Sequence, residues 1–363
     1  MFVNNKKISL RQLQALLLLQ CFGTAVLFLP AELAVQSGRE CWIVALLGGG
    51  VFAGVSLLLS MLSEQNGDIV RWCKGIFGNI AGTAVLLGLA GKFLFDGACE
   101  LRIFSEVVCR SMLPNTPVWV LSPVLLLLCG FLAGKGIEAY GRLAEILFFF
   151  TVIPLGLLLL AVAVTAEYQR LLPLELPSVR GLVSGVGAVS VVFQGLPFLY
   201  FLFPYLKKPK QAKRAVLGST ALLGAVVTGI VLLSLAAFGA VPLSEKLLPT
   251  LQLFERVSFT GIFLTRQDVV FLWFWMCSAV VFVSGVLLAV VYLAVRLFPQ
   301  IRDKRKQWLW SVAVLLWVVS FLPENLTMAY RLRMEIAPWL QLLYLGILPF
   351  GLLLLRKGGK RDA

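Results

Sequence analysis

The sequence predicts an all-α membrane protein that crosses the bilayer ten times, and three observations support this prediction. Hydrophobic residues make up 60% of the 363 residues and charged residues only 14%, whereas soluble chains usually carry about 25% charged residues. The mean hydropathy is +0.92, and apolar stretches recur along the chain without a soluble-looking interval of domain size. Backbone polar groups in lipid must pair within their own segment, which favours helices over open strands.

Ten apolar segments are long enough to cross about 30 Å of hydrocarbon, which takes about 20 helical residues. In chain order we expect them at 10–35, 41–62, 80–113, 117–134, 143–165, 182–206, 213–240, 266–298, 307–323 and 336–355. The first segment continues past Pro30 without a small-residue cleavage pattern, so it is not predicted to be a cleavable signal. We expect one membrane domain over 1–363, with residues 10–165 and 182–355 as two repeats of five spans.

The positive charges predict the orientation of these spans, because Lys and Arg are retained on the cytoplasmic side. Of the 32 lysines and arginines, 21 lie in the alternate loops and tails that share a side with both termini, and ten lie on the other side. Both termini are therefore predicted to be cytoplasmic. The basic clusters at 207–214 and 302–306 are interpreted as orientation signals, with anionic lipid or an acidic partner as the alternative. Because the positive charges that give the net charge of +14 follow this membrane pattern, we expect no nucleic-acid partner.

The residue types present exclude several kinds of chemistry. The chain has no histidine, which excludes histidine bases and histidine-ligated zinc. Its seven cysteines are scattered without a C-x-x-C pair, which indicates neither a metal cluster nor a disulfide framework. We therefore expect no cofactor and no metal, and a hydrolytic or redox enzyme is not indicated.

The first span of each half contains a glycine followed by a proline, a pairing that weakens an α-helix and then breaks it. These residues are Gly23 with Pro30, and Gly195 with Pro197. An odd number of spans per half inverts the second half, and inverted-repeat transporters bind solute where corresponding helices are broken. Each glycine lies 13 residues into its span, about 20 Å from opposite membrane faces. An ordinary glycine–proline kink is the alternative interpretation of each break.

Unwound backbone at this depth must face protein, water or a ligand, because lipid cannot satisfy its polar groups. Half-helix ends present a positive dipole to a carboxylate and carbonyl oxygens to an ammonium group. The pair of breaks therefore predicts a site for a zwitterion such as an amino acid.

The third span carries five charged residues, which are costly in a membrane and usually face a bundle interior or a wet cavity. They are Lys92, Asp96, Glu100, Arg102 and Glu106. Lys92 and Asp96 are four residues apart and are predicted to form an intramembrane charge pair. A structural ion pair and a role in a solute or proton pathway both remain open.

Several short motifs, in order along nearly the whole chain, resemble those of one family. They are Ile8-Ser9-Leu10-Arg11-Gln12-Leu13 with Gly23-Thr24 and Phe28-Leu29-Pro30; Leu101-Arg102 with Phe104 and Glu106; Leu113-Pro114-Asn115-Thr116-Pro117; Gly136-Ile137-Glu138 with Arg142 and Glu145; Gly195 with Pro204-Tyr205-Leu206-Lys207-Lys208-Pro209; and Pro249-Thr250-Leu251 with Gly261, Phe263-Leu264, Arg266 and Asp268. The chain resembles the B subunits of spore germinant receptors, also called endospore germination permeases, of the amino acid–polyamine–organocation superfamily.

This resemblance implies a LeuT-like fold of five plus five spans, with spans one and six broken. It also implies a location in the inner spore membrane, beside an A subunit and a lipoprotein C subunit. The implied substrate-binding residues are Gly23, Thr24 and Ala25 from span one and Gln194, Gly195 and Leu196 from span six. Phe95 and Ser278 are further candidates from their positions on spans three and eight.

The implied function is the sensing of a small germinant, expected to be an amino acid, with a signal passed to partner subunits. The first alternative is a proton-coupled amino-acid transporter. Some proton-coupled relatives use a lysine on span five as the cation that responds to protons, whereas residues 146–164 here contain no basic residue. Lys92 can take over this role only if Asp96 releases it. The second alternative is a scaffold that assembles the other subunits without binding a ligand.

Overall fold

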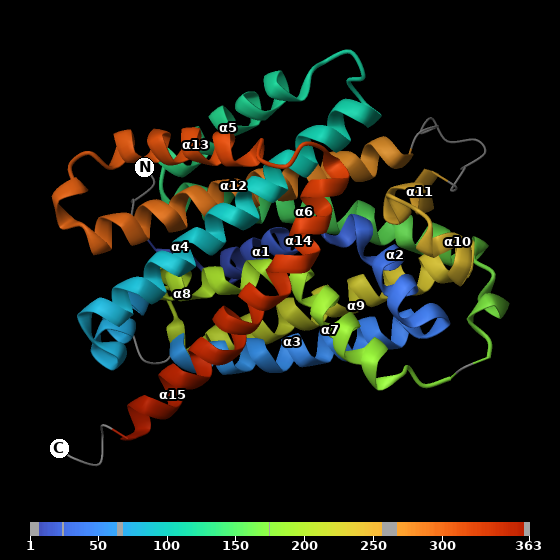
Figure 1. The fold of residues 1–363 in the computed structure, drawn as a ribbon, viewed down its shortest axis with the longest axis horizontal. Coiled ribbons are helices and arrows are strands. Elements are labelled where there is room, and N and C mark those ends of the chain that lie inside the picture. The colour runs from blue at the N-terminus through green and yellow to red at the C-terminus, as the bar shows by residue number, and fades with distance from the viewer. Residues whose placement is uncertain (1–6, 24, 64–67, 174, 256–266, 359–363) are drawn as a thin grey trace.

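A computed structural model describes residues 7–23, 25–63, 68–173, 175–255 and 267–358, and helices make up almost all of this part of the chain (Figure 1). In the first half the helices are α1 (Leu10–Cys21), α2 (Ala25–Ser37), η1 (Gly38–Glu40), α3 (Cys41–Ser63), α4 (Ile69–Ser111), α5 (Val118–Gly134), α6 (Ile137–Thr165) and η2 (Tyr168–Leu171). In the second half they are α7 (Val179–Val192), η3 (Phe193–Phe198), α8 (Leu199–Leu202), η4 (Phe203–Tyr205), η5 (Pro209–Gln211), α9 (Ala212–Phe238), α10 (Ala240–Ser244), α11 (Pro249–Glu255), α12 (Gln267–Leu297), η6 (Pro299–Ile301), α13 (Arg305–Ser320), α14 (Leu326–Gln341), η7 (Leu342–Ile347) and α15 (Leu348–Gly358).

Seven helical stretches of the described chain are long and apolar enough to cross a membrane. They are Ala25–Leu62, Ile69–Ser111, Ile137–Thr165, Val179–Tyr205, Pro209–Phe238, Phe271–Leu297 and Leu326–Leu354. The helices α1, α5 and α13 are shorter, at 12, 17 and 16 residues. The prediction of an all-α, multi-pass membrane protein is therefore confirmed, while the count of ten crossings stays a prediction.

The long helices form two groups with α1 between them (Figure 1). On one side α3 packs along α9, and α7 packs against α2 and α3. On the other side α4 packs along α12, and α13 lies against α4, α5 and α12. The helix α14 contacts both groups, through α7 and α4. The two interrupted spans therefore lie in the interior, where their backbone is shielded from lipid.

The interruption of the first span lies between the end of α1 at Cys21 and the start of α2 at Ala25, and its described residues are Phe22 and Gly23. Pro30 lies inside α2, so the expectation that the proline contributes to this break is wrong. Pro30 has no N–H to donate to the carbonyl of Val26, four residues earlier. The Thr250 hydroxyl on α11 donates to that carbonyl oxygen over 2.7 Å, which explains how a proline is accommodated within a buried helix.

The interruption of the sixth span is a change of helix type. The α-helix ends at Val192 and the chain continues as a 3₁₀ helix over Phe193–Phe198. Our expectation of unwound backbone is therefore corrected here: the backbone is tightened into i→i+3 geometry, which is typically used in short segments at functional hinges. Pro197, which lies in this segment, has no N–H with which to continue α-helical pairing.

Two helices begin earlier than the hydropathy predicts. The helix α4 begins at Ile69 instead of residue 80, and bends at Gly78, whose φ of 79° favours glycine. The helix α14 begins at Leu326 instead of residue 336, because the Asn325 side chain accepts a hydrogen bond from the Met328 amide and caps it. The turns that follow carry Arg331, Arg333 and Glu335, which is why the predicted span begins only after them.

Candidate functional site

The two interrupted spans touch each other at their glycines. A Cβ atom on Gly195 would lie 2.7 Å from the Cys21 sulfur and 3.0 Å from the Cys21 backbone nitrogen. A Cβ atom on Gly23 would lie 2.6 Å from Nε2 of Gln194 and 3.3 Å from both carboxylate oxygens of Glu100. The shortest distance at each glycine is below normal contact: a side chain at Gly195 would overlap Gln20 and Cys21 at the end of α1, and one at Gly23 would displace the Gln194 amide.

A cluster of three polar side chains, which we call the central cluster, lies where the breaks meet: Glu100 from α4, Gln194 from η3 and Arg333 from α14. Nη1 of Arg333 donates to Oε2 of Glu100 over 2.8 Å, and Nη2 donates to Oε1 of Gln194. Nε2 of Gln194 donates to the Glu100 carboxylate over 3.4 Å. All three side chains are at most 1% exposed. The cluster therefore joins the interrupted sixth span to α4 and to α14.

Burial determines what this cluster can do. Removing a carboxylate and a guanidinium from water costs several kcal/mol per ion, and good geometry with extra hydrogen bonds must offset it. The side-chain amide of Gln194 supplies such bonds to both charged groups. A guanidinium and a carboxylate held side by side match the two charges of an amino acid, which brings a carboxylate and an ammonium group.

The carbonyl groups at the end of α1 are capped by α12. The Ser278 hydroxyl is shared between the carbonyl oxygens of Leu19, at 2.5 Å, and Phe22. The last carbonyls of a helix have no partner within the helix, so this serine stabilises the interrupted end of α1. Ser278 is predicted from its helix position as a binding residue. Its hydroxyl contacts the backbone carbonyl groups of the break.

A second buried network links the same turn of α1 to α6 and α12. Nε2 of Gln20 donates to the Tyr140 hydroxyl over 2.6 Å, and that hydroxyl donates to the carbonyl oxygen of Val281 over 2.8 Å. The break in span one is therefore held on two sides by side chains from other helices, which fixes its position in the bundle.

Lys92 and Asp96 form an ion pair on the same face of α4 as Glu100. Nζ of Lys92 lies 2.5 Å from Oδ2 of Asp96, and both side chains are buried. Within the described chain, Oδ1 of Asp96 has no hydrogen-bond partner. The neighbouring Phe93 ring lies 4.6 Å, centroid to centroid, from Phe198 at the end of η3. The charge pair thus lies beside the break in span six. Asp96 precedes Glu100 by four residues and Lys92 precedes it by eight.

Both ends of the paired spans are closed in this structure. At the end near the N-terminus, the Ile8 amide donates to the Tyr205 carbonyl over 2.8 Å and the Lys207 amide donates to the Ile8 carbonyl over 3.0 Å. At the opposite end, the Ser37 hydroxyl donates to the Gly181 carbonyl over 3.3 Å. These contacts tie the two spans together at both ends, and the central cluster between them is at most 1% exposed.

The remaining predicted residues are placed as follows. Ala25 is the buried first residue of α2, and Leu196 is buried in η3. Thr24 lies outside the described residues, as do Gly261, Phe263, Leu264 and Arg266 of the motif before α12. Phe95 is half-buried and lies five residues before Glu100. On an α-helix this turns its side chain about 140° away from that of Glu100.

Sequence reasoning missed Arg333 and recognised Glu100 only as part of a charge anomaly. Arg333 was assigned to a loop outside the membrane, whereas it lies on the buried face of α14. A signal was present in the spacing, because the buried residues of this helix recur every three to four positions. They are Leu326, Ala329, Arg333, Ala337 and Gln341. A polar residue in register with an apolar stripe indicates a buried partner.

Comparison with known proteins agrees with this architecture. The chain aligns with the structure of MhsT in complex with L-phenylalanine, with a TM-score of 0.61 and 16% identity, covering 94% of this chain and 97% of that one. It also aligns with a sialic acid symporter in a substrate-bound, outward-open state, with a TM-score of 0.63 and 11% identity, covering 93% of this chain and 78% of that one. At such identities the likeness concerns the fold alone. It defines the class of protein: a LeuT-fold membrane protein with interrupted first and sixth spans.

Sequence comparison gives the family. The model of the family described as "Spore germination protein" matches residues 7–329, and the chain belongs to this family. It is 23% identical to spore germination protein YndE of Bacillus subtilis (strain 168), over 99% of each chain. It is 25% identical to spore germination protein B2 of the same organism, over 68% of this chain and 67% of that one. It is also 25% identical to spore germination protein GerQB of Bacillus cereus, over 65% of this chain and 66% of that one.

Proposed function

We propose that this chain is the B-type subunit of a spore germinant receptor and that it binds an amino acid at the central cluster. The observation that carries the proposal is the buried Glu100–Arg333 ion pair, bridged by Gln194, at the contact between the two interrupted spans. Membership of the spore germination protein family supports the biological setting. The bound L-phenylalanine of the MhsT structure supports the class of ligand.

The recognition mechanism is an exchange of ion pairs. The ligand carboxylate takes the place of Glu100 on the guanidinium of Arg333, and the ligand ammonium binds the Glu100 carboxylate. Each buried charge keeps an opposite partner throughout, which avoids the penalty of an unpaired buried ion. The side-chain amide of Gln194 can both donate and accept, so it can follow either partner during the exchange.

The signal is a change in the position of α14 relative to the interrupted spans. A ligand can shift such an equilibrium only by its difference in affinity for the two states. In this structure Arg333 ties α14 to α4 and η3, whereas a bound ligand would hold α14 through its own carboxylate. We propose that A and C subunits in the inner spore membrane read this movement. Both termini face the cytoplasm in this proposal, as the loop charges predict.

The first test is a thermal-shift screen of the purified chain against the amino acids, followed by germination of spores that carry Gly23→Trp or Gly195→Trp. Gly54→Trp on α3 is the matched control, because a Cβ there meets no atom within 4 Å. We expect both site variants to abolish the response at normal protein level and the control to retain it. Unchanged sensitivity to the germinant in both site variants would refute this placement of the site. It would instead favour the non-binding scaffold.

A proton-coupled amino-acid transporter is the second candidate, favoured by the fold and by the buried Lys92–Asp96 pair beside the break. Uptake of labelled amino acid into proteoliposomes, with and without a proton gradient, separates the two functions. The sensor predicts saturable binding without accumulation. Accumulation that follows the gradient and is lost in Lys92→Met would favour the transporter.

A further inference from the structure

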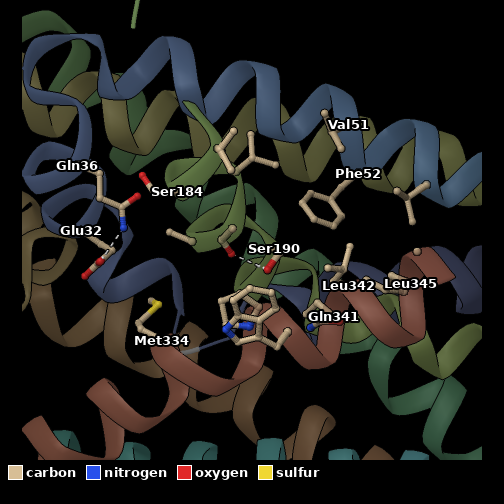
Figure 2. Close-up of a pocket in the computed structure, with 18 of the residues that line it drawn as sticks. Glu32, Gln36, Val51, Phe52, Ser184, Ser190, Met334, Gln341, Leu342 and Leu345 are labelled. Carbon is tan, nitrogen blue, oxygen red and sulfur yellow. Dashed lines mark hydrogen bonds between the residues drawn. The ribbon is translucent and has the colours of Figure 1, made fainter. Parts of the chain in front are cut away.

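A cavity of about 570 Å³ lies beside the central cluster, between α2, α3, α7, α14 and the π-helical turn η7 (Figure 2). This volume lies within the range of about 300–1,000 Å³ that is typical of small-molecule sites. Figure 2 shows Glu32 and Gln36 at one end of the cavity and Leu342 and Leu345 at the other. Of the predicted binding residues that the structure describes, none lines it.

The cavity contains a buried amide without partners. Gln341 lines the cavity and is 1% exposed, and neither its Oε1 nor its Nε2 has a hydrogen-bond partner within the described part of the chain. An unsatisfied buried polar group costs about 1–3 kcal/mol. The adjoining turn Leu342–Ile347 is a π-helix, a rare conformation that occurs frequently at functional sites. Together these features indicate a ligand that brings a hydrogen-bond donor and an acceptor to this position.

At one end of the cavity the Glu32 carboxylate is already paired by the protein, whereas Oε1 of the neighbouring Gln36 has no hydrogen-bond partner within the described chain. The two oxygens of the Glu32 carboxylate accept hydrogen bonds from the Gln36 amide, over 2.8 Å, and the Tyr330 hydroxyl, over 2.7 Å. A ligand therefore does not need a positive charge to complete this site. The remaining lining is mostly apolar.

The rim of the cavity faces the hydrocarbon of the bilayer. Val183 and Trp339 line it and are 70% and 72% exposed, which in a membrane protein means contact with lipid. Gln341 lies 15 residues past the start of α14, about 22 Å along the helix, where lipids present only methylene groups. An acyl chain could fill this cavity but could not pair with the amide.

We propose that this cavity is a binding site for an uncharged, membrane-soluble small molecule with one amide-like hydrogen-bonding group, which pairs with the side chain of Gln341. Its walls adjoin the central cluster. Phe52 in the lining stacks on Phe193, the first residue of η3, with 4.8 Å between ring centroids, and Met334 in the lining follows Arg333. The occupant therefore lies against α14, which carries Arg333, and is separated by the Phe52 ring from η3, which carries Gln194.

The test uses 4-pentylbenzamide as the probe and pentylbenzene as its counterpart without a polar group. Binding of each to the purified full chain in nanodiscs is measured by competition with a photoreactive analogue of the probe, with mapping of the labelled residues. We expect labelling of the cavity lining, and tighter binding of the amide than of the hydrocarbon. Gln341→Leu should weaken amide binding about tenfold or more, through loss of two hydrogen bonds, and leave the hydrocarbon unaffected.

Gly187→Leu provides an independent variant, because a Cβ there meets only Pro338, at 3.9 Å, so the added side chain can extend into the cavity. It should abolish binding of both molecules, whereas Gly229→Leu on α9, where a Cβ meets open space, should not. Equal binding of amide and hydrocarbon would overturn the proposal and assign the cavity to lipid chains. Labelling elsewhere, or unchanged amide binding in Gln341→Leu, would overturn it as well. These outcomes do not depend on amino-acid binding at the central cluster.

Discussion

The central cluster predicts a characteristic double-mutant cycle. Glu100 and Arg333 are fully desolvated and bonded to each other over 2.8 Å. Replacing one of them with glutamine leaves the other charge buried without its counter-ion, which costs about 3–5 kcal/mol. At about 1.4 kcal/mol per factor of ten, this is roughly two to three and a half powers of ten in the unfolding equilibrium. The double variant Glu100→Gln with Arg333→Gln removes both charges, and we expect its stability within about 1 kcal/mol of that of the native chain.

The assay is reversible denaturant unfolding in mixed micelles, with far-ultraviolet circular dichroism as the probe. Glu167→Gln serves as the control, because its ion pair with Arg170 is largely solvent-exposed and should contribute less than about 1 kcal/mol. All three cluster variants, including the stable double variant, should bind the amino acid at least about tenfold more weakly. Additive costs in the double variant, or single costs as small as that of the control, would refute the account of the cluster as a coupled buried pair.

Two further substitutions test how the interrupted spans are packed and paired. Gly195→Ala should lower the free energy of unfolding by about 1–3 kcal/mol, because its Cβ would overlap the last turn of α1. Gly54→Ala, in open space, should be neutral or slightly stabilising. Equal effects of the two substitutions in thermal unfolding would argue against the close approach of the two interrupted spans. Thr250→Val should cost about 1–3 kcal/mol by leaving the Val26 carbonyl unpaired. Thr83→Val is the control, because the Thr83 hydroxyl donates to the Asn79 carbonyl of its own helix and that carbonyl keeps its helical partner. It should cost less in the same measurement, and an equal cost would contradict the role assigned to Thr250.

Much of the fold was predictable because each apolar segment must satisfy its own backbone in lipid. The positions of both breaks were predictable for a related reason: Gly23 and Gly195 lie at matching depth in corresponding spans. The nature of each break was not predictable, because it depends on tertiary partners. Pro30 is accommodated within α2 by a hydroxyl from α11, more than 200 residues later in the chain, and the sixth span stays helical through a change of type.

The chemistry of the candidate site was only partly predictable. Gln194 was among the binding residues that the family resemblance implies, whereas its charged partners come from helices that hydropathy alone does not bring to the breaks. Arg333 escaped notice because the charged residues Arg331, Arg333 and Glu335 in the first half of α14 place this part of the chain outside the predicted span. The spacing of buried positions along that helix carries the missing information, but only once the helix is known to begin at Leu326.

The account depends on recognition of both charges of an amino acid by the central cluster. Once the screen has identified an amino acid that binds, the most direct measurement is the affinity of the purified chain for that compound and two analogues. One analogue lacks the carboxylate and the other lacks the ammonium group. We expect both analogues to bind at least about tenfold more weakly, and Arg333→Gln to remove the preference for the carboxylate. Equal affinities for all three compounds would contradict the central claim.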